Sequence, residues 1–312
     1  MTRIAIATSI PPRLVRHVNG REVGKEYQDR CVESWLMAGF RILSANFADE
    51  IPLLAQRYPQ VHFLSIERPK SGWKAPAIDD LLRALAAQEE DIVGIINADI
   101  LLGSSDWLNP IESAVHGAIV AGRRVDIDSL DLQIHEAYPF GFDFFFFERE
   151  AIPELTNRPF SIGKPWWDYY LPLVFRLRGL EIRLLVSPDA FHLKHPTAYD
   201  WPTWRFMATE FAELILEFPS DSQAPPAPEL VPVIKLSRKI VSGSKVYETV
   251  PTSLWARVWG QILRLASHLP GGFSQISKWH FGQDADRHRL SNACTEAIST
   301  SIVHSGSREP PS

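Results

Sequence analysis

Strand and helix signals alternate along the first two hundred residues, and this alternation constrains the fold more than any other feature of the chain. Short apolar runs predict strands at 3–9, 41–47, 61–67 and 91–96. Segments with apolar residues at helical spacing lie between them, at 25–38, 49–57 and 76–88. Strands separated by helices indicate βαβ units, so we expect an α/β fold with a mostly parallel sheet sandwiched by helices.

The run at 92–96, Ile-Val-Gly-Ile-Ile, is apolar at every position. A strand without polar alternation is typical of a sheet that is covered on both faces. In such sheets, ligands bind beyond the carboxyl ends of the strands. The stretches that most inform function are therefore 9–13, 67–74 and 97–101.

Beyond residue 118 the chain predicts further strands and helices, and then its character changes. A stretch rich in Pro, Ser and Ala at 220–232 is typical of a linker, and the chain from 284 onward is polar and rich in Ser. We therefore expect an α/β domain over 1–218, a linker with a short extended segment over 219–251, a C-terminal amphipathic helical region over 252–283 and a disordered tail over 284–312.

Composition excludes several classes of protein. Apolar residues make up 45% of the 312 residues and charged residues 22%, which excludes a fully disordered chain or a collagen. A net charge of -5 gives no basis for nucleic-acid binding. The chain has two cysteines, no signal peptide and no run of about 18 apolar residues, so we expect a cytoplasmic protein.

The predicted helix at 252–268 carries Trp255 and Trp259 on an apolar stripe. The favoured interpretation is that this stripe docks on the α/β domain. The alternative is peripheral contact with the inner face of a membrane, because tryptophans beside arginines are typical of interfacial helices.

Two nucleotide-binding motifs are absent from the sequence. The turn after the first strand, at 8–13, has no glycine, whereas a dinucleotide fold needs glycine there to approach a pyrophosphate. The sequence also has no P-loop. If the sheet binds a nucleoside diphosphate, a divalent cation held by carboxylates is the expected source of neutralising charge.

The segment Asn97-Ala98-Asp99 follows the most apolar strand and is a candidate for that cation site. Alternate residues of an extended chain point the same way, so Asn97 and Asp99 could face one pocket. An amide carbonyl and a carboxylate are suitable ligands for a hard cation. The alternative is that Asp99 only caps the turn into the next element.

The order of these elements resembles the GT-A fold of nucleotide-sugar glycosyltransferases, of the family 2 kind, over roughly 3–217. The resemblance rests on a first strand that ends in Thr-Ser-Ile-Pro-Pro-Arg, a helix at 75–85 and the strand that closes on Asn97-Ala98-Asp99. The last element is similar to the family's Asp-any-Asp metal motif, with Asn in the first place. The resemblance implies a hexosyltransferase that uses a nucleotide-diphosphate-sugar donor, a carbohydrate or other hydroxyl acceptor, and Mn²⁺ or Mg²⁺.

The resemblance also implies roles for two later motifs. Asp168 follows Trp166 and Trp167 at the start of a helix, where inverting members place the general base that deprotonates the acceptor. The alternative is a first-turn acid that only stabilises the helix. His192 would complete the metal shell with Asp99, and is preferred to His195 because the latter precedes Pro196 and a turn. The alternative for His192 is a packing or surface residue.

The remaining site residues are assigned by their place at strand ends, except for Trp166 and Trp167, which precede Asp168 and whose rings could pack on a sugar face. Candidates for donor binding are Ser9, Pro11, Arg13, Glu67, Lys74, Asn97 and Lys194. Candidates on the acceptor side are Asp143, Trp166 and Trp167.

The sequence thus favours a metal-dependent, inverting glycosyltransferase, and three alternatives stay open. A retaining transferase could use the same fold. A sugar nucleotidyltransferase is disfavoured because 8–13 lacks the glycines of that family's loop. A non-catalytic relative that binds carbohydrate or protein is kept open by Asn97, which stands where the family's motif has an acid.

Overall fold

The chain forms two compact units in a computed structural model. The first contains Met1–Tyr199 with Ser301–Ser312, and the second contains Asp200–Thr300. The structure describes residues 3–68, 74–103, 106–132, 134–137, 141–185, 189–195, 201–218, 227–248, 272–300 and 302–304. The predicted boundary at 218 therefore lies one helix too late, because the helix that follows Tyr199 belongs to the second unit.

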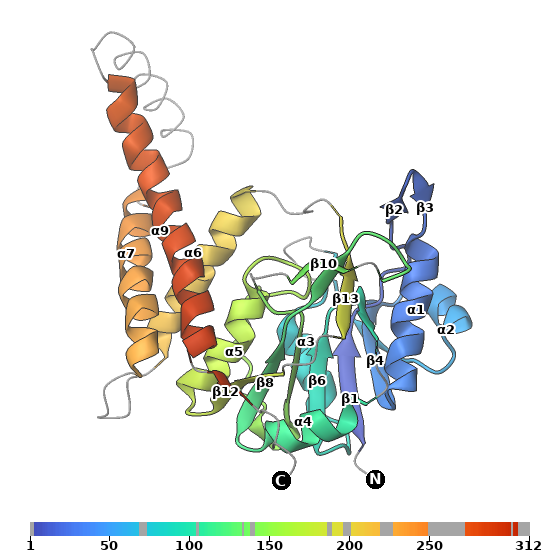
Figure 1. The fold of residues 1–312 in the computed structure, drawn as a ribbon. Helices are drawn as coiled ribbons and strands as arrows, with labels where there is room; N and C mark the ends of the chain where they lie inside the picture. Colours follow the sequence, from blue (N-terminus) through green and yellow to red (C-terminus); the bar gives the residue numbers. More distant parts are fainter. Residues whose placement is uncertain are drawn as a thin grey trace, which may run out of the picture. The chain divides into compact units, whose positions relative to one another are not determined.

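The first unit is built on an eight-stranded sheet with the order β14-β12-β8-β11-β6-β1-β4-β5 (Figure 1). Its strands are β1 (Ile4–Thr8), β4 (Phe40–Phe47), β5 (His62–Ile66), β6 (Ile92–Ile96), β8 (Ala118–Gly122), β11 (Phe144–Glu148), β12 (Glu181–Leu184) and β14 (Ile302–His304). Neighbouring strands are parallel except that β11 runs antiparallel to β6 and β8. The predicted mostly parallel sheet is confirmed.

Helices cover both faces of this sheet. Its helices are α1 (Gly24–Met37), α2 (Ile51–Arg57), α3 (Ile78–Ala86), α4 (Leu108–Val115) and α5 (Trp167–Leu177). Helices α1 and α4 share one apolar core with inward residues of β1, β4, β6 and β11. Helices α3 and α5 pack on the opposite face, where the buried stripe of α3 meets β1, β4 and β6. The absence of polar alternation in β6 follows from this double cover.

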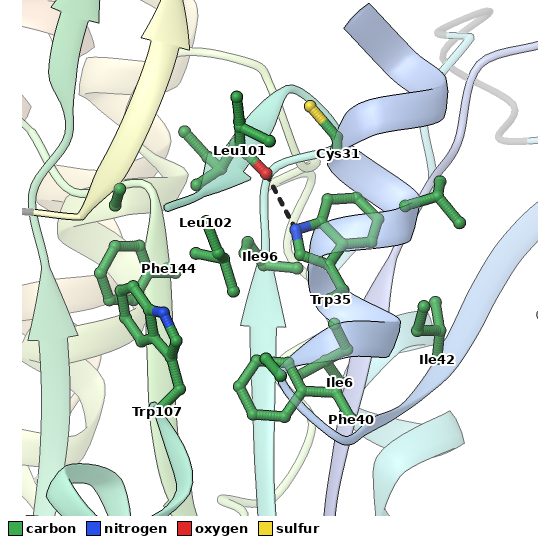
Figure 2. Packing of buried hydrophobic residues seen from close by; sticks show 14 of the residues in the cluster. Ile6, Cys31, Trp35, Phe40, Ile42, Ile96, Leu101, Leu102, Trp107 and Phe144 are labelled. Atoms are coloured by element: carbon green, nitrogen blue, oxygen red, sulfur yellow. Dashed lines mark hydrogen bonds between the residues drawn. The ribbon is translucent and has the colours of Figure 1, made fainter. Parts of the chain in front are cut away.

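Trp35 of α1 anchors the core on the first face (Figure 2). Its ring is fully buried, and its indole N–H donates a hydrogen bond of 2.8 Å to the carbonyl of Ile100. Trp107, which precedes α4, packs edge-on against Phe144 with ring centroids 5.6 Å apart. Because Ile100 comes directly after Asp99, the indole bond fixes the chain where β6 ends.

The four consecutive phenylalanines of β11 are buried on alternate faces of the sheet. Phe144 and Phe146 belong to the core under α1 and α4. Phe145 packs edge-on against Trp167, and the Phe147 ring lies 4.7 Å from that of Phe175, both partners being on α5. The run is therefore core and not an exposed aromatic platform.

The close packing beside β11 makes Gly94 sensitive to substitution. A Cβ at this position would lie 2.5 Å from the Phe146 ring and 2.6 Å from the carbonyl oxygen of Phe145, which cannot rotate away. We expect Gly94→Ala to lower the free energy of unfolding by about 1–3 kcal/mol, because overpacking forces the backbone to shift. Urea denaturation measures this, with Ser65→Ala on an exposed position of β5 as the control. Equal stability of the two variants would contradict the packing described for β6 and β11.

A second sheet with the order β10-β9-β13-β7 lies beyond the carboxyl ends of the main strands, and the sequence did not predict it. Its strands are β7 (Ile100–Leu102), β9 (Val125–Ile127), β10 (Ile134–Ala137) and β13 (Ala190–Leu193). In the register of this sheet, His192 lies opposite Ile100 on one side and Asp126 on the other. A short hairpin of β2 (His17–Val18) and β3 (Arg21–Glu22) precedes α1.

The second unit consists of helices α6 (Trp201–Glu217), α7 (Val231–Glu248) and α9 (Gly272–Thr300), with a short 3-10 turn at Pro228–Leu230. Helix α7 packs against both α6 and α9. None of the helices in the described ranges is long and apolar enough to cross a membrane. The predicted helix at 252–268, with Trp255 and Trp259, lies outside the described residues.

Two predictions for this region are wrong. The segment expected to be linker and extended chain holds α7, whose buried side chains Val233, Ser237 and Ile240 recur at helical spacing. Pro232 is compatible with this helix because it lies in the first turn. The residues from 284 to 300, expected to be disordered, form the end of α9, and 302–304 form β14. The buried stripe of α9 consists of Leu290, Ala293, Cys294, Ala297 and Ile298. Three of these five side chains are small, and this weakens the apolar signal of the stripe in a Ser-rich segment.

Candidate functional site

A pocket lies at the carboxyl ends of β1 and β6, where the sequence predicts the ligand site. Its volume is 220 Å³. It is lined by Ser9, Pro11, Pro12, Leu14, Asn46, Glu50, Lys74, Ala75, Asn97, Ala98, Asp99, Ile162 and Gly163. The structure thus brings together five predicted residues, because Ser9 and Pro11 follow β1, Asn97 and Asp99 follow β6, and Lys74 comes from the loop before α3.

Asp99 is the centre of a cluster of basic side chains. Its Oδ2 atom lies 2.6 Å from Nη2 of Arg16, 3.3 Å from Nε2 of His192 and 3.7 Å from Nε2 of His195. Burial by itself would raise the pKa of Asp99, but His192, Arg16 and His195 outweigh burial and hold this pKa far below its ordinary value. Asp99 is therefore a carboxylate at every physiological pH.

His192 is held between two carboxylates. Its Nδ1 atom lies 2.9 Å from Oδ1 of Asp126, and Nε2 faces Asp99. Burial opposes the charged form, but Asp99 and Asp126 raise the pKa of His192 to about 9. A carboxylate on one ring nitrogen is the usual means of orienting the other nitrogen toward a metal ion. Asp126 thus fixes the direction in which Nε2 points.

A chain of polar contacts continues from Asp126 to the strand that carries Asn97. Arg124 donates from Nε to Asp126 Oδ1 at 2.9 Å and from Nη1 to Asp143 Oδ1 at 2.7 Å. The side-chain amide of Asn97 donates to the same Asp143 oxygen at 2.9 Å. Asn97 is therefore a partner of Asp143 as well as a lining residue of the pocket, and an asparagine suits this position because it can donate.

Asp143 is 3% exposed and is used on one oxygen only in the described part of the chain. Its Oδ2 atom is buried without a hydrogen-bond partner among those residues. Its negative charge raises the pKa of Asp168, a residue of α5. The sequence placed Asp143 on the acceptor side, and the structure shows that it acts on Arg124, Asn97 and Asp168.

Asp168 lies in the first turn of α5, two residues after Trp166, which has a left-handed backbone and caps the start of the helix. Burial and the nearby Asp143 raise the pKa of Asp168 to about 7, against the backbone N–H groups of Phe142 and Tyr169. A side chain at Gly141 would collide with its carboxylate, so a glycine is needed there. The hydrogen bonds from backbone amides are those expected of an acid in the first turn of a helix. The raised pKa is that expected of a general base that acts near neutral pH.

Several predicted site residues do not contribute to the pocket as expected. Trp166 and Trp167 are 2% and 3% exposed and pack on Tyr169 and Phe145, so the prediction that their rings line the acceptor side is wrong. The reason is that Phe145 faces α5, so the ring of Trp167 covers this face of the sheet instead of facing solvent. Arg13 and Glu67 are exposed at strand ends and are not among the residues that line the pocket.

Lys194 was expected beside His192, facing the diphosphate. It is exposed instead, and its Nζ lies 3.4 Å from Oδ1 of Asp128. The reason is that β13 ends at Leu193, so the alternation that would carry Lys194 to the same side does not continue.

Three site residues were missed by sequence reasoning, and one was placed second. Arg16, Tyr27 and Arg124 belong to no motif. The contact of Asp126 with His192 follows only from the pairing of β9 with β13. His195 was ranked below His192 because of Pro196, yet both imidazoles approach Asp99. The signal that could have found His195 is the pair of histidines three residues apart at the end of a buried strand.

Tyr27 joins the two strands that carry the cluster. Its hydroxyl has one proton to share between the carbonyls of Asp99 at 2.9 Å and Phe191 at 3.1 Å, and it accepts a 2.8 Å bond from the amide of Leu193. The residue is fully buried on α1. One hydroxyl therefore holds the backbone on both sides of His192 and at Asp99.

We expect Tyr27→Phe to cost about 1–3 kcal/mol in the free energy of unfolding, since it leaves buried backbone groups unpaired. We also expect it to weaken Mn²⁺ binding about tenfold, because the strands lose their registration. Urea denaturation and calorimetric titration measure the two effects. Tyr58→Phe is the control, because the Tyr58 hydroxyl bonds to Asp29 and Gln28 away from the cluster. Equal loss of Mn²⁺ affinity in both variants would refute a specific role for Tyr27.

The cluster has a donor set that fits a divalent metal. One oxygen of Asp99 and one nitrogen each of His192 and His195 lie within 4.8 Å of one another. One carboxylate with two imidazoles suits a first-row transition metal such as Mn²⁺ better than Mg²⁺, which prefers oxygen ligands. Asp126 supplies the hydrogen bond that orients a metal-binding histidine. The residues present therefore fit the metal that the sequence resemblance implies.

No family model and no curated protein matches the sequence. Among solved structures, the chain is similar to residues 1–349 of TarS from S. aureus, a structure in complex with UDP-GlcNAc. The TM-score is 0.49 at 10% identity, over 96% of this chain and 91% of that one. It is also similar to the mannosyltransferase PcManGT from Pyrobaculum calidifontis, in complex with GDP-Man and Mn²⁺. That TM-score is 0.47 at 14% identity, over 96% of this chain and 86% of that one.

Proposed function

We propose that this chain is a metal-dependent, inverting glycosyltransferase that transfers a sugar from a nucleotide-diphosphate-sugar donor to a hydroxyl acceptor. The observation that carries the proposal is the cluster of Asp99, His192 and His195 beside a pocket at the carboxyl ends of β1 and β6. That edge is where open α/β sheets bind nucleotides. The absence of a glycine-rich phosphate loop leaves the diphosphate to this cluster and to nearby cations.

The residues of the pocket divide the work of donor binding. Asp99, His192 and His195 would hold the divalent cation, preferably Mn²⁺. When bound, such a cation neutralises the diphosphate and stabilises the charge that develops on the leaving group. Lys74 lines the same pocket and offers a further cation to a phosphate. Ser9, Pro11 and Asn97 shape the pocket around the donor.

Asp168 is the proposed general base. As the acceptor oxygen bonds to the anomeric carbon, the bond from that carbon to the diphosphate breaks, and the hydroxyl proton passes to Asp168. A carboxyl with a pKa of about 7 is better suited to take this proton at neutral pH than an ordinary aspartate. Attack from the face opposite the leaving group inverts the anomeric configuration. The charge of Asp143 helps to raise the pKa of Asp168. Asp143 is itself too deeply buried to contact the acceptor.

Release of nucleoside diphosphate from a panel of nucleotide sugars, with Mn²⁺ and hydroxyl acceptors, tests this function. We expect one donor to be consumed in a metal-dependent way, with the transferred sugar in the anomeric configuration opposite to that of the donor by NMR. Retention of configuration would show that the enzyme is a retaining transferase, and it would refute the role of Asp168 as the base of an inverting step. No turnover with any donor would favour a non-catalytic protein that binds carbohydrate or protein.

A further inference from the structure

Arg16 occupies the oxygen atom that the proposed metal would use. Its Nη2 lies 2.6 Å from Asp99 Oδ2, the atom that also faces His192 and His195. The guanidinium has been brought there by a loop before the β2–β3 hairpin, 83 residues away in the sequence. An ion pair at this atom and a metal bond at this atom compete with each other.

The side chain of Arg16 is buried without being fully used. It is 10% exposed. Nη1 donates to the carbonyl of Val15 at 2.9 Å, and Nε is buried with no partner among the described residues. A guanidinium offers five N–H donors, and the contacts with Val15 and Asp99 use only two of them. An anion with several oxygens, such as a diphosphate, matches this unused fork.

The backbone of Arg16 is fixed while its side chain is long. The Arg16 carbonyl accepts a 2.8 Å bond from the amide of Val23, at the start of α1. The neighbouring loop is held by Glu22, which accepts from the amide of Gly24 at 2.8 Å. Leu14, two residues before Arg16, lines the pocket together with Asp99. The guanidinium can therefore change partners within the pocket edge without movement of its Cα.

Charge balance favours such an exchange. Around Asp99 the free protein places Arg16, His192 and His195, with Asp126 behind His192 and Arg124 behind Asp126. A divalent cation on Asp99 would set a like charge beside the guanidinium and drive it off. A donor diphosphate brings negative oxygens to the same place, and the negative charge on it grows as the sugar leaves.

We propose that Arg16 is a donor-phosphate ligand held in reserve on Asp99: it competes with the metal in the free protein and moves to the diphosphate when metal and donor are both bound. This inference rests on the proposed function. It assigns a specific phosphate contact to a residue outside every motif of the sequence. It also makes the metal and the nucleotide bind in a coupled way.

The proposal predicts opposite effects of Arg16→Gln on two affinities. Without its competitor, Asp99 is expected to bind Mn²⁺ alone about threefold more tightly or better. With Mn²⁺ saturating, the affinity for the nucleoside diphosphate is expected to fall about tenfold, as one charge-assisted contact is lost. His192 and His195 still compensate Asp99 in this variant, so the fold should persist. Calorimetric titration measures both affinities.

The controls separate this role from a structural one. Arg21→Gln alters an exposed arginine of the same hairpin and should change neither affinity. Arg16→Lys retains a buried cation if the glutamine variant fails to fold. Because an ammonium lacks the planar fork, nucleotide affinity should fall in it while Mn²⁺ affinity does not. If Mn²⁺ affinity falls together with nucleotide affinity, or if nucleotide affinity is unchanged, in the variants that fold, the proposal is overturned.

The probes are Mn²⁺ and a panel of UDP, GDP, ADP, CDP and dTDP. If the wild-type protein binds one of these with Mn²⁺ and the Arg16 variants behave otherwise than predicted, the reserve role alone fails. If the wild-type protein binds none of them, the proposed function fails, and the role of Arg16 fails with it.

Discussion

Asp99→Asn is expected to lower the rate of metal-dependent sugar transfer by about 10³-fold or more. The neutral amide removes the anionic ligand of the metal cluster, and a metal ion contributes several kcal/mol of charge stabilisation to such a reaction. The same substitution should abolish calorimetric Mn²⁺ binding. Nucleoside diphosphate release and Mn²⁺ titration are the two measurements.

The control for Asp99 is an aspartate that flanks the same strand. Asp91 precedes β6 at its opposite end, and its side chain is 96% exposed. Asp91→Asn should leave both the rate and Mn²⁺ binding unchanged. The folded state of Asp99→Asn should survive, because Asp126 still holds His192 through Nδ1 and the asparagine keeps the size of the side chain. Full activity in a folded Asp99→Asn protein would rule out the metal site.

Asp168→Asn is expected to lower the transfer rate by about 10²–10⁴-fold, the contribution of a general base. In the wild-type protein the rate should rise with pH and level off above about 7, where Asp168 is deprotonated. The asparagine variant should lose this acidic limb. The rate measured from pH 5 to pH 8, with Glu150→Gln as an exposed control, tests the assignment.

The same substitution should change how stability depends on pH. The ordinary pKa of 3.8 applies to Asp168 in the unfolded chain, and the folded pKa is about 7. Between these values the folded protein holds a proton that the unfolded chain has lost, so the free energy of unfolding falls as pH rises through this window. An asparagine removes this term. We therefore expect Asp168→Asn to gain roughly 1–3 kcal/mol on the wild type between pH 4 and pH 8.

Urea denaturation at pH 4, 6 and 8 measures that gain. A stability difference that stays constant across these pH values would show that Asp168 does not hold a proton in the folded state. If the gain in stability depends on pH but activity is retained, Asp168 is a buried carboxyl without a catalytic role.

The local part of this fold could be predicted from the sequence, because it is encoded by neighbouring residues. The apolar run of β6 marks a central strand, and Asn97 and Asp99 follow it at the edge where ligands bind. Asp168 and His192 were singled out in another way, through the roles that the resemblance to the GT-A family implies for their motifs. For Asn97 and Asp99, position along the chain was enough to place them at the pocket.

The second sheet could not be predicted because its strands are short and its pairing is distant. Strand β9 has three residues, one of them Asp126, and contains no clear alternation. The pair of His192 with Asp126 joins positions 66 residues apart. Arg16 lies in a loop where no periodic pattern exists, and only its long side chain reaches Asp99. Contacts of this kind follow from tertiary packing and leave little trace in local sequence.

Burial explains why some residues were wrongly assigned to the site or to a disordered tail. Trp166 and Trp167 were assigned to the acceptor side because aromatic rings pack on sugar faces, but Trp167 packs against Phe145 of β11 in the core. The end of α9 was interpreted as disordered because Ser and polar residues are frequent there. Its buried stripe consists largely of alanine and cysteine, which pack helices closely but contribute little to a hydrophobic pattern.

Thermal unfolding of the wild-type protein and of Asp99→Asn, with each nucleoside diphosphate in the presence and absence of Mn²⁺, tests the central claim most directly. A ligand at about 100 times its Kd adds about 2.7 kcal/mol to stability, which raises the Tm by a few degrees. We predict that one nucleotide stabilises the wild-type protein only with Mn²⁺, and that Asp99→Asn loses this effect. No shift with any nucleotide, or an equal shift in the variant, would contradict a metal-dependent donor site at Asp99.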